Sequence, residues 1–187
     1  MGDTLKYFAY GSNLLAERLC IGSCPSVKVS DSFVKCGKIN GWYLEFANPG
    51  HESLWMGGSA TIKKGSSEAV VWGAIWKIDA NDLKNLDFQE CVHEGLYYRV
   101  KSPEDILIVD SENQPIDCYT YIMNDRAMLS KPSPQYKHVI LCGAKQIDLP
   151  IEYRENVLEA IETNDNAEVK INLSVLPNGK VPVFRSV

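Results

Sequence analysis

The clearest hydrophobic pattern in the chain lies in residues 69–78, where both alternating sets of positions are largely apolar. One set contains Val70, Trp72, Ala74, Trp76 and Ile78, and the other contains Val71, Gly73 and Ile75. Side chains alternate between the two faces of a strand, so a strand that is apolar on both faces is typical of the interior of a sheet. We therefore predict a central strand over residues 69–78.

Shorter runs rich in β-branched and aromatic residues predict further strands. The predicted strands are residues 6–10, 27–35, 39–46, 57–62, 96–101, 106–109 and 116–123, with 106–109 paired to 116–123, and Asn48-Pro49-Gly50 marks a turn. Helical spacing of apolar residues predicts a helix over 80–90, capped by Asp79, and two more after Pro134. Strands outnumber helices and do not alternate regularly with them, which favours an α+β domain with a mixed or mostly antiparallel sheet.

The first predicted strand runs into Gly11-Ser12-Asn13, and a helix-like stretch begins at Leu14. Glycine tolerates backbone angles that other residues resist, and asparagine is a good N-cap, so Asn13 is expected to cap this helix. A turn that opens a helix presents free amide N–H groups at the positive end of the helix dipole. We predict that it binds a substrate carboxylate. The alternative is an ordinary tight turn, which these residue types commonly form.

The predicted helix over 80–90 carries an unusual glutamate. Glu90 lies seven residues after Leu83 and four after Leu86, so it shares their apolar face. A carboxylate on such a face loses water, which raises its pKa toward the range useful for proton transfer. Asp87 flanks the same stripe and is the second candidate. The alternative is that the helix ends before Glu90 and that its side chain meets water.

Composition narrows the classes of function. The chain has 187 residues and a formal net charge of −5, with no face-sized cluster of Lys and Arg, which argues against nucleic-acid binding. No apolar run approaches the roughly 20 residues that span a bilayer, and no signal-peptide pattern is present. The six cysteines are therefore expected to be reduced thiols of a cytoplasmic protein. The histidines and cysteines show no metal-ligand spacing. We expect one domain over residues 1–187.

Several motifs in order resemble one family. The opening Tyr7-Phe8-Ala9-Tyr10-Gly11-Ser12-Asn13-Leu14 is similar to the signature of the gamma-glutamylcyclotransferases. The resemblance continues through Gly58-Ser59-Ala60-Thr61-Ile62, Val71-Trp72-Gly73-Ala74-Ile75-Trp76-Lys77, Leu86-Asp87-Phe88-Gln89-Glu90, Ser133-Pro134-Gln135-Tyr136-Lys137 and Glu152-Tyr153. It covers roughly residues 5–165, and an irregular C-terminal tail follows.

This resemblance implies a compact mixed β-barrel flanked by α-helices, with no metal or organic cofactor, that often forms a homodimer. The family converts gamma-glutamyl amino acids to 5-oxoproline and the free amino acid. Its catalytic glutamate matches Glu90, and the implied substrate-binding residues are Tyr7, Ala9, Tyr10, Gly11, Ser12, Asn13, Leu14, Tyr97 and Tyr121. The chain departs from the family at Phe88, where a charged residue is common, and at Cys91, where glycine often stands.

Two other functions stay open from the sequence. A non-catalytic protein that binds or senses a small anionic metabolite could use the same turn, although a desolvated glutamate is poorly suited to holding an anion. A sibling cyclotransferase that acts on glutathione or gamma-glutamyl-lysine is the second alternative. Ser12-Asn13 after the Tyr-Gly pair favours the group that acts on gamma-glutamyl amino acids.

Overall fold

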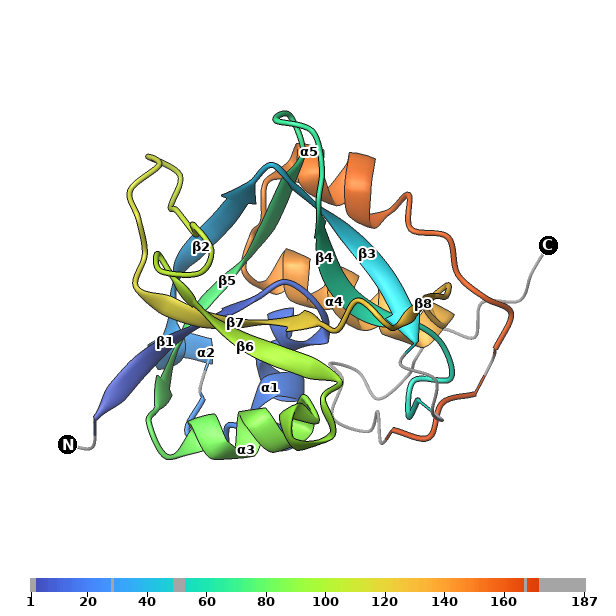
Figure 1. Ribbon diagram of the computed structural model, residues 1–187, viewed down its shortest axis with the longest axis horizontal. Coiled ribbons are helices and arrows are strands. Elements are labelled where there is room, and N and C mark those ends of the chain that lie inside the picture. The colour runs from blue at the N-terminus through green and yellow to red at the C-terminus, as the bar shows by residue number, and fades with distance from the viewer. Residues whose placement is uncertain (1–2, 28, 49–52, 167, 172–187) are drawn as a thin grey trace.

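The computed structural model describes residues 3–27, 29–48, 53–166 and 168–171. Its strands form two sheets (Figure 1). The five-stranded sheet has the order β2 (Phe33–Asn40), β5 (Val70–Asp79), β1 (Thr4–Ala9), β7 (Cys118–Met123) and β6 (Tyr97–Ser102). The three-stranded sheet has the order β4 (Ser59–Lys64), β3 (Trp42–Asn48) and β8 (Met128–Leu129).

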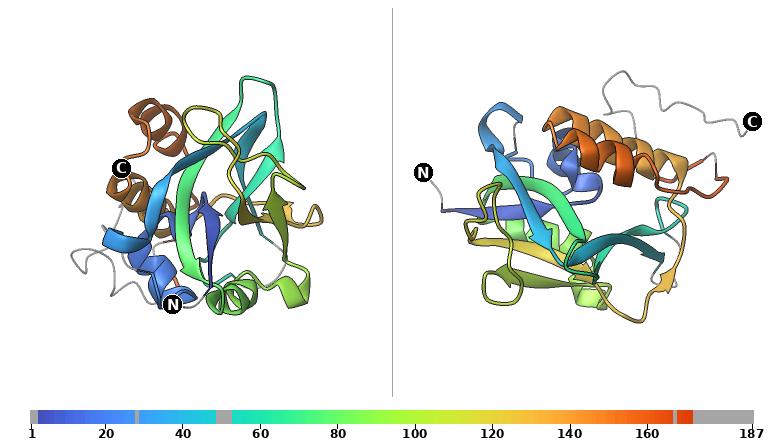
Figure 2. Two further views of the ribbon diagram at one scale, coloured as in Figure 1. Left: turned by 90° about the vertical axis from the view of Figure 1, so that its left-hand side faces the viewer. Right: turned by 90° about the horizontal axis from the view of Figure 1, so that it is seen from above.

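The helices are α1 (Ala16–Gly22), α2 (Val29–Ser32), α3 (Asp82–Gln89), α4 (Pro134–Gln146) and α5 (Ile151–Tyr153), with short 3-10 turns at Ser12–Leu14 and Val92–Glu94 and a π-helical turn at Arg154–Leu158. In both views of Figure 2 the C-terminal helices (orange) lie on one side of the strands, and β6 and β7 lie on the other. The expected α+β class is confirmed.

The expected barrel needs a more exact description. β1 pairs antiparallel with β5 and parallel with β7, so the large sheet is mixed as expected. Within the described residues, however, the two sheets do not close into one hydrogen-bonded barrel. Side chains join them instead: Thr61 of β4 accepts a hydrogen bond from the Met123 amide of β7 at 3.0 Å. The barrel implied by the resemblance is thus two sheets packed together.

β5 has the central position that its double apolar pattern predicts. It pairs with β1 on one side and β2 on the other, and Ala74, Ile75 and Trp76 are fully buried. A Cβ at Gly73 would lie 2.3 Å from the carbonyl oxygen of Ala9, so only glycine lets β1 pass this closely. β5 therefore holds β1, and the turn that follows it, in place.

Three strand predictions differ from the structure. Residues 27–35 contain α2 and only the start of β2. Residues 39–46 are not one strand, because the chain turns between β2 and β3 at Gly41, whose φ of +77° suits glycine. Residues 106–109 form no regular strand against β7, because β6 pairs with that edge of β7. Part of the predicted hairpin does form: Val109 bridges Pro115 as well as Lys38, and the Ile116 amide donates to the Ile108 carbonyl at 2.8 Å. The predicted turn at Asn48-Pro49-Gly50 lies partly outside the described residues, as does the C-terminal tail.

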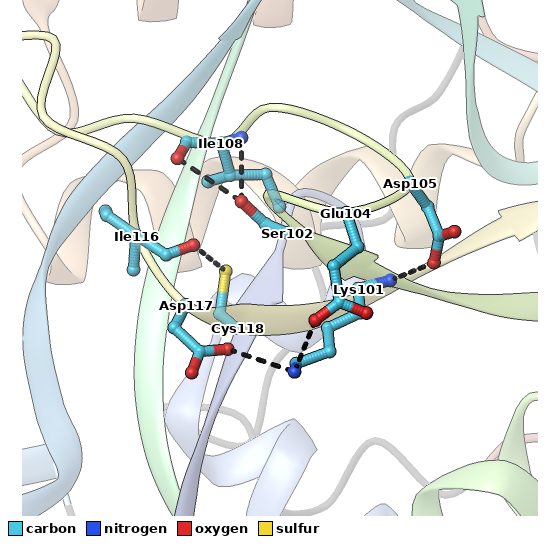
Figure 3. Close-up of polar contacts among 8 residues, drawn as sticks. All are labelled: Lys101, Ser102, Glu104, Asp105, Ile108, Ile116, Asp117 and Cys118. Carbon is cyan, nitrogen blue, oxygen red and sulfur yellow. Dashed lines mark hydrogen bonds and ion pairs between the residues drawn. The ribbon is translucent and has the colours of Figure 1, made fainter.

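The loop between β6 and β7 is held by its own polar contacts (Figure 3). The Ser102 hydroxyl accepts a hydrogen bond from the Ile108 amide at 3.0 Å, and the Lys101 amide donates to Asp105 at 2.8 Å. Lys101 Nζ also lies 2.8 Å from Glu104. These local bonds satisfy the backbone amides of Lys101 and Ile108.

Helix α4 supports the turn after β1 from behind. Ser133 caps the helix by accepting from the Tyr136 amide at 3.3 Å, and Pro134 stands in the first turn, where its missing N–H costs nothing. A Cβ at Gly143 would lie 2.5 Å from backbone atoms of Leu14 and Leu15. The close contact of α4 with this turn positions the wall of the site.

Candidate active site

A cavity of about 540 Å³ opens between the turn after β1, the C-terminal end of α3 and strands β6 and β7. Its wall combines aromatic rings with a few polar side chains, as small-molecule sites do. The residues that line it include Tyr7, Tyr10, Gly11, Ser12, Asn13, Arg18, Ile21, Leu54, Trp55, Phe88, Gln89, Glu90, Tyr97, Tyr121 and Tyr136.

Asn13 does not cap a helix, contrary to the expectation. The turn is a 3-10 helix, and α1 begins only at Ala16 without a side-chain cap. The Asn13 side-chain amide instead donates to the hydroxyl of Tyr7 at 3.2 Å and to Oε1 of Glu90 at 3.3 Å. Its backbone carbonyl accepts from the indole N–H of Trp76 at 3.0 Å, which fixes the turn to β5. The asparagine therefore positions the glutamate rather than the helix.

The amide cradle is smaller than the sequence predicts. The amides of Leu14 and Leu15 donate to the carbonyls of Gly11 and Ser12 at 3.0 and 3.2 Å. Those two N–H groups are used inside the turn and are not available to a ligand. The Ser12 amide bonds to the Tyr136 hydroxyl, so the amides of Gly11 and Asn13 are the candidate donors that remain in this turn.

Glu90 is the first residue after α3, and its amide still donates to the Leu86 carbonyl at 2.9 Å. The predicted helix thus ends one residue early, but the last turn still directs the side chain into the cavity. Its Oε1 accepts hydrogen bonds from the side-chain amides of Gln89 at 3.1 Å and Asn13 at 3.3 Å. Burial raises the pKa of Glu90 to about 7, against the opposing effects of Gln89, the charge of Arg18 and Asn13. This glutamate can accept and return a proton near neutral pH.

Asp87, the second candidate, lies outside this cavity wall. Its carboxylate lies 2.6 Å from Nη1 of Arg99 and accepts a hydrogen bond from the Tyr121 hydroxyl at 2.7 Å. With both partners in place, Asp87 serves to hold β6 and β7 against α3.

Five tyrosines line the cavity while their hydroxyls bind protein groups. Tyr10 donates to the carbonyl of Tyr121 at 2.6 Å, and Tyr97 donates to the carbonyl of Ala60 at 2.7 Å. Burial, followed by the nearby Glu90 charge, raises the pKa of Tyr7 and Tyr10 well above the usual value. These hydroxyls are therefore neutral, and the tyrosines shape the cavity rather than exchange protons.

Two of the expected substrate-binding residues do not line the cavity. Ala9 is buried in β1 beneath the turn, and Leu14 is buried against α4. Both act through the backbone that they position. The other expected residues, from Tyr7 and Tyr10 through Gly11, Ser12 and Asn13 to Tyr97 and Tyr121, all contribute to the wall.

Sequence reasoning missed Arg18, Gln89, Trp55 and Tyr136. Arg18 and Gln89 are polar residues on helices, which usually face water, and nothing in their spacing distinguishes them. Tyr136 sits on the apolar stripe of α4, which predicts core packing; its hydroxyl accepts from the Ala60 amide at 3.0 Å. The packing of α1, α3 and α4 brings Arg18, Gln89 and Tyr136 to one cavity, and the segment between β3 and β4 adds Trp55.

Among the described residues, no group of three or more His, Cys, Asp or Glu side chains is arranged to hold a metal ion. No helix among those residues is long and apolar enough to cross a membrane.

The chain is similar to proteins of one family. The AIG2-like family model matches residues 70–157. Gamma-glutamylcyclotransferase of Bos taurus is 38% identical over 166 residues, which cover 88% of this chain and 82% of that protein. Gamma-glutamylcyclotransferase of Homo sapiens is 38% identical over 165 residues, which cover 87% and 81%. A solved structure named gamma-glutamyl cyclotransferase superposes with a TM-score of 0.79 at 35% identity, covering 92% of this chain and 96% of that chain.

The α+β fold and the cavity with its raised-pKa glutamate define a small-molecule site equipped for acid–base chemistry. The matches extend over most of this chain and most of each relative. The chain belongs to the gamma-glutamylcyclotransferase family, which confirms the resemblance in its motifs.

Proposed function

We propose that the chain is a gamma-glutamylcyclotransferase that converts gamma-L-glutamyl amino acids to 5-oxo-L-proline and the free amino acid, with Glu90 as general base and acid. The observation that supports this role most strongly is the position of Glu90: its carboxyl lies in the cavity wall, bonded to Asn13 of the turn, with a pKa of about 7. The family relationship supports the reaction type.

In the proposed reaction the α-amino nitrogen of the substrate attacks its own γ-carbonyl carbon. The nitrogen begins as an ammonium group, so Glu90 first removes a proton from it. A carbon–nitrogen bond closes the five-membered lactam, and the bond to the leaving amine breaks. Glu90 returns that proton to the leaving nitrogen. The attacking nitrogen gives up a second proton as it becomes the lactam N–H, and this proton also goes to the leaving nitrogen, which departs as an ammonium group, so no proton is gained or lost overall. No protein nucleophile is needed.

The turn after β1 has a binding role in this proposal. Amides of Gly11 and Asn13 hold the glutamyl carboxylate or the oxygen on which charge develops, and preorganised donors lower the barrier most where charge appears. The aromatic wall around Tyr7 and Tyr97 keeps the glutamyl arm bent, which turns an infrequent conformer into the bound one.

The test of function is a substrate panel. Gamma-glutamyl-alanine, glutathione and gamma-glutamyl-lysine are each incubated with the protein, and released 5-oxoproline is measured. Product from gamma-glutamyl-alanine with little from the other two is expected. Product mainly from glutathione or gamma-glutamyl-lysine identifies a sibling cyclotransferase, and no product from any of them identifies a binding protein.

The test of the residue is Glu90→Gln, which keeps the shape but removes the base. We expect kcat to fall by about 10²- to 10⁴-fold while gamma-glutamyl-alanine still binds, measured by the fluorescence change of Trp55 in the cavity wall. The matched control is Glu94→Gln, because Glu94 is an exposed glutamate four residues further on. Near-normal release of 5-oxoproline by Glu90→Gln would refute the assignment.

Cytoplasmic localisation is also proposed, from the cysteines, and homodimer formation is proposed from the family resemblance. All six cysteines, which all lie in the described part of the chain, are free thiols, as a reducing compartment favours. Sedimentation of the purified chain tests the dimer, and fractionation of cells tests the compartment.

A further inference from the structure

Arg18 of α1 is held in the cavity wall by three neighbours. Its Nη1 donates to Oε1 of Gln89 at 3.2 Å, and its guanidinium carbon lies 5.8 Å from the centroid of the Trp55 ring. The third neighbour is Gly22, where an added Cβ would lie 1.9 Å from Nη1 of Arg18 and 2.2 Å from Oε1 of Gln89. The absence of a side chain at Gly22 therefore makes room for the pair.

The guanidinium of Arg18 has unused hydrogen-bonding capacity. Its Nε is buried and has no hydrogen-bond partner among the described residues. An arginine offers five N–H donors, and the bond to Gln89 uses only one of them. Burial lowers the pKa of Arg18 by more than the nearby Glu90 charge raises it, so the negative charge around this cation does not offset its desolvation. The guanidinium of Arg18 is thus a charged donor group whose desolvation no neighbouring anion offsets.

Arg18 stands between the inner cavity and its opening. The inner wall is formed by buried residues such as Tyr10 and Asn13, whereas three residues of the rim are exposed: Ile21 by 61%, Leu54 by 59% and Phe88 by 72%. Arg18 lies three residues before Ile21 on α1, and its partner Gln89 is next to Phe88. Arg18 and Gln89 thus line the same cavity as Glu90 and are chain neighbours of two of its exposed rim residues.

We propose that Arg18 forms a second carboxylate subsite, which binds the α-carboxylate of the leaving amino acid and selects gamma-glutamyl amino acids over gamma-glutamylamines. This inference rests on the proposed function. With the glutamyl arm inside, beside Glu90 and the turn, the leaving residue extends toward the rim. A gamma-glutamyl amino acid carries a carboxylate on that residue, and a gamma-glutamylamine does not. The planar arginine fork suits a carboxylate.

The test compares two substrates that differ in this carboxylate alone. They are gamma-glutamyl-alanine and gamma-glutamyl-ethylamide, since ethylamine is alanine with hydrogen in place of the carboxylate. The readout is the ratio of their kcat/KM values for release of 5-oxoproline. A change in the proton affinity of Glu90 affects both substrates and cancels in this ratio.

For the unmodified protein we expect a ratio of about 10 to 100 in favour of the alanine substrate, the usual strength of a hydrogen bond between charged groups. Arg18→Met is expected to lower the ratio to about 1 to 3. Gly22→Ala keeps every charge but displaces the guanidinium of Arg18, so it is expected to lower the ratio by several-fold. This variant replaces Arg18→Met in the test if Arg18→Met does not fold. Arg126→Met, which removes an exposed arginine outside the cavity, is the control and should leave the ratio unchanged.

An unmodified ratio near one, or a ratio unaffected by Arg18→Met, overturns the subsite. Equal losses for both substrates also overturn it, because Arg18 would then serve the glutamyl arm. If neither substrate yields 5-oxoproline, the proposed function fails, and dissociation constants in the Glu90→Gln background decide the subsite separately. Tighter binding of the alanine substrate that Arg18→Met abolishes supports it; equal binding of the two substrates overturns it.

Discussion

Two carboxylates at the C-terminal end of α3, three residues apart, have different surroundings: Asp87 lies in the helix and Glu90 directly follows it. Asp87 has a full complement of partners, with Arg99 at 2.6 Å and the Tyr121 hydroxyl at 2.7 Å. Glu90 accepts hydrogen bonds from two neutral side-chain amides, and burial raises its pKa to about 7. The oxygens of Asp87 are bonded to a charged side chain and a hydroxyl, whereas the pKa of Glu90 lies where a carboxyl exchanges a proton near neutral pH.

This difference separates a structural role from a chemical one. A carboxylate that is paired with a cation gains stability but loses basicity, because its partner favours the charged form. A carboxylate in a cavity is costly to the folded state but is basic enough to act at neutral pH. Helix α3 positions both, and only the tertiary neighbours of each decide which role it has.

The largest expected effect concerns stability at alkaline pH. The pKa of Glu90 is about 7 in the folded protein against 4.5 as the ordinary value, so the folded state binds the proton more tightly. The contribution of Glu90 to the free energy of unfolding is therefore greatest below pH 4.5 and declines as the pH rises toward 7. Glu90→Gln removes the decline, and we expect it to stabilise the protein relative to the unmodified chain by on the order of 2–3 kcal/mol more at pH 8 than at pH 4.5.

Urea unfolding of both proteins at pH 4.5 and pH 8 measures this difference. Glu94→Gln is the control and should show no pH-dependent gain. A Glu90→Gln protein whose advantage is the same at both pH values would show that the glutamate is ordinarily solvated, and the contrast with Asp87 would disappear.

Replacement of Asp87 is expected to change the free energy of unfolding by a smaller amount and to lower it. Asp87→Ala leaves Arg99 and the Tyr121 hydroxyl without their acceptor and should destabilise the protein by about 1–2 kcal/mol. Because Asp87 lies outside the cavity wall, kcat/KM should fall by less than about tenfold, well below the loss expected for a general base. Chemical unfolding and steady-state kinetics measure the two quantities, and a loss of activity as large as that of Glu90→Gln would reverse the assignment of roles.

The smallest effect is expected in the pH profile of kcat/KM. The acid limb of the unmodified protein should have an apparent pKa of about 7, with activity rising as Glu90 loses its proton. Gln89→Leu removes a hydrogen bond that favours the charged carboxylate, so the limb should move to higher pH. Assays between pH 5 and 9 follow the shift; a limb that moves to lower pH contradicts this account of how Glu90 is tuned.

Local patterns predicted a large part of this molecule. The double apolar pattern of residues 69–78 correctly predicts β5, and the spacing from Leu86 correctly directs Glu90 inward although the helix ends at Gln89. The predictions failed where a long-range contact overrode local preference. Asn13 is a good cap by type, but Tyr7 and Glu90 take its side-chain amide. Residues 106–109 look like a strand, but β6 occupies the pairing edge of β7.

The sequence by itself determined the α+β class, the family motifs and the two residues, Asn13 and Glu90, on which the proposed chemistry depends. The tertiary structure alone decided that Asp87 is paired, that the amides of Leu14 and Leu15 are used within the turn, and that Arg18 reaches the cavity. The physical reason is the distance along the chain over which each kind of interaction acts. Strand and helix periodicity act between near neighbours in the chain, whereas burial and hydrogen-bond partners depend on residues that only folding brings together.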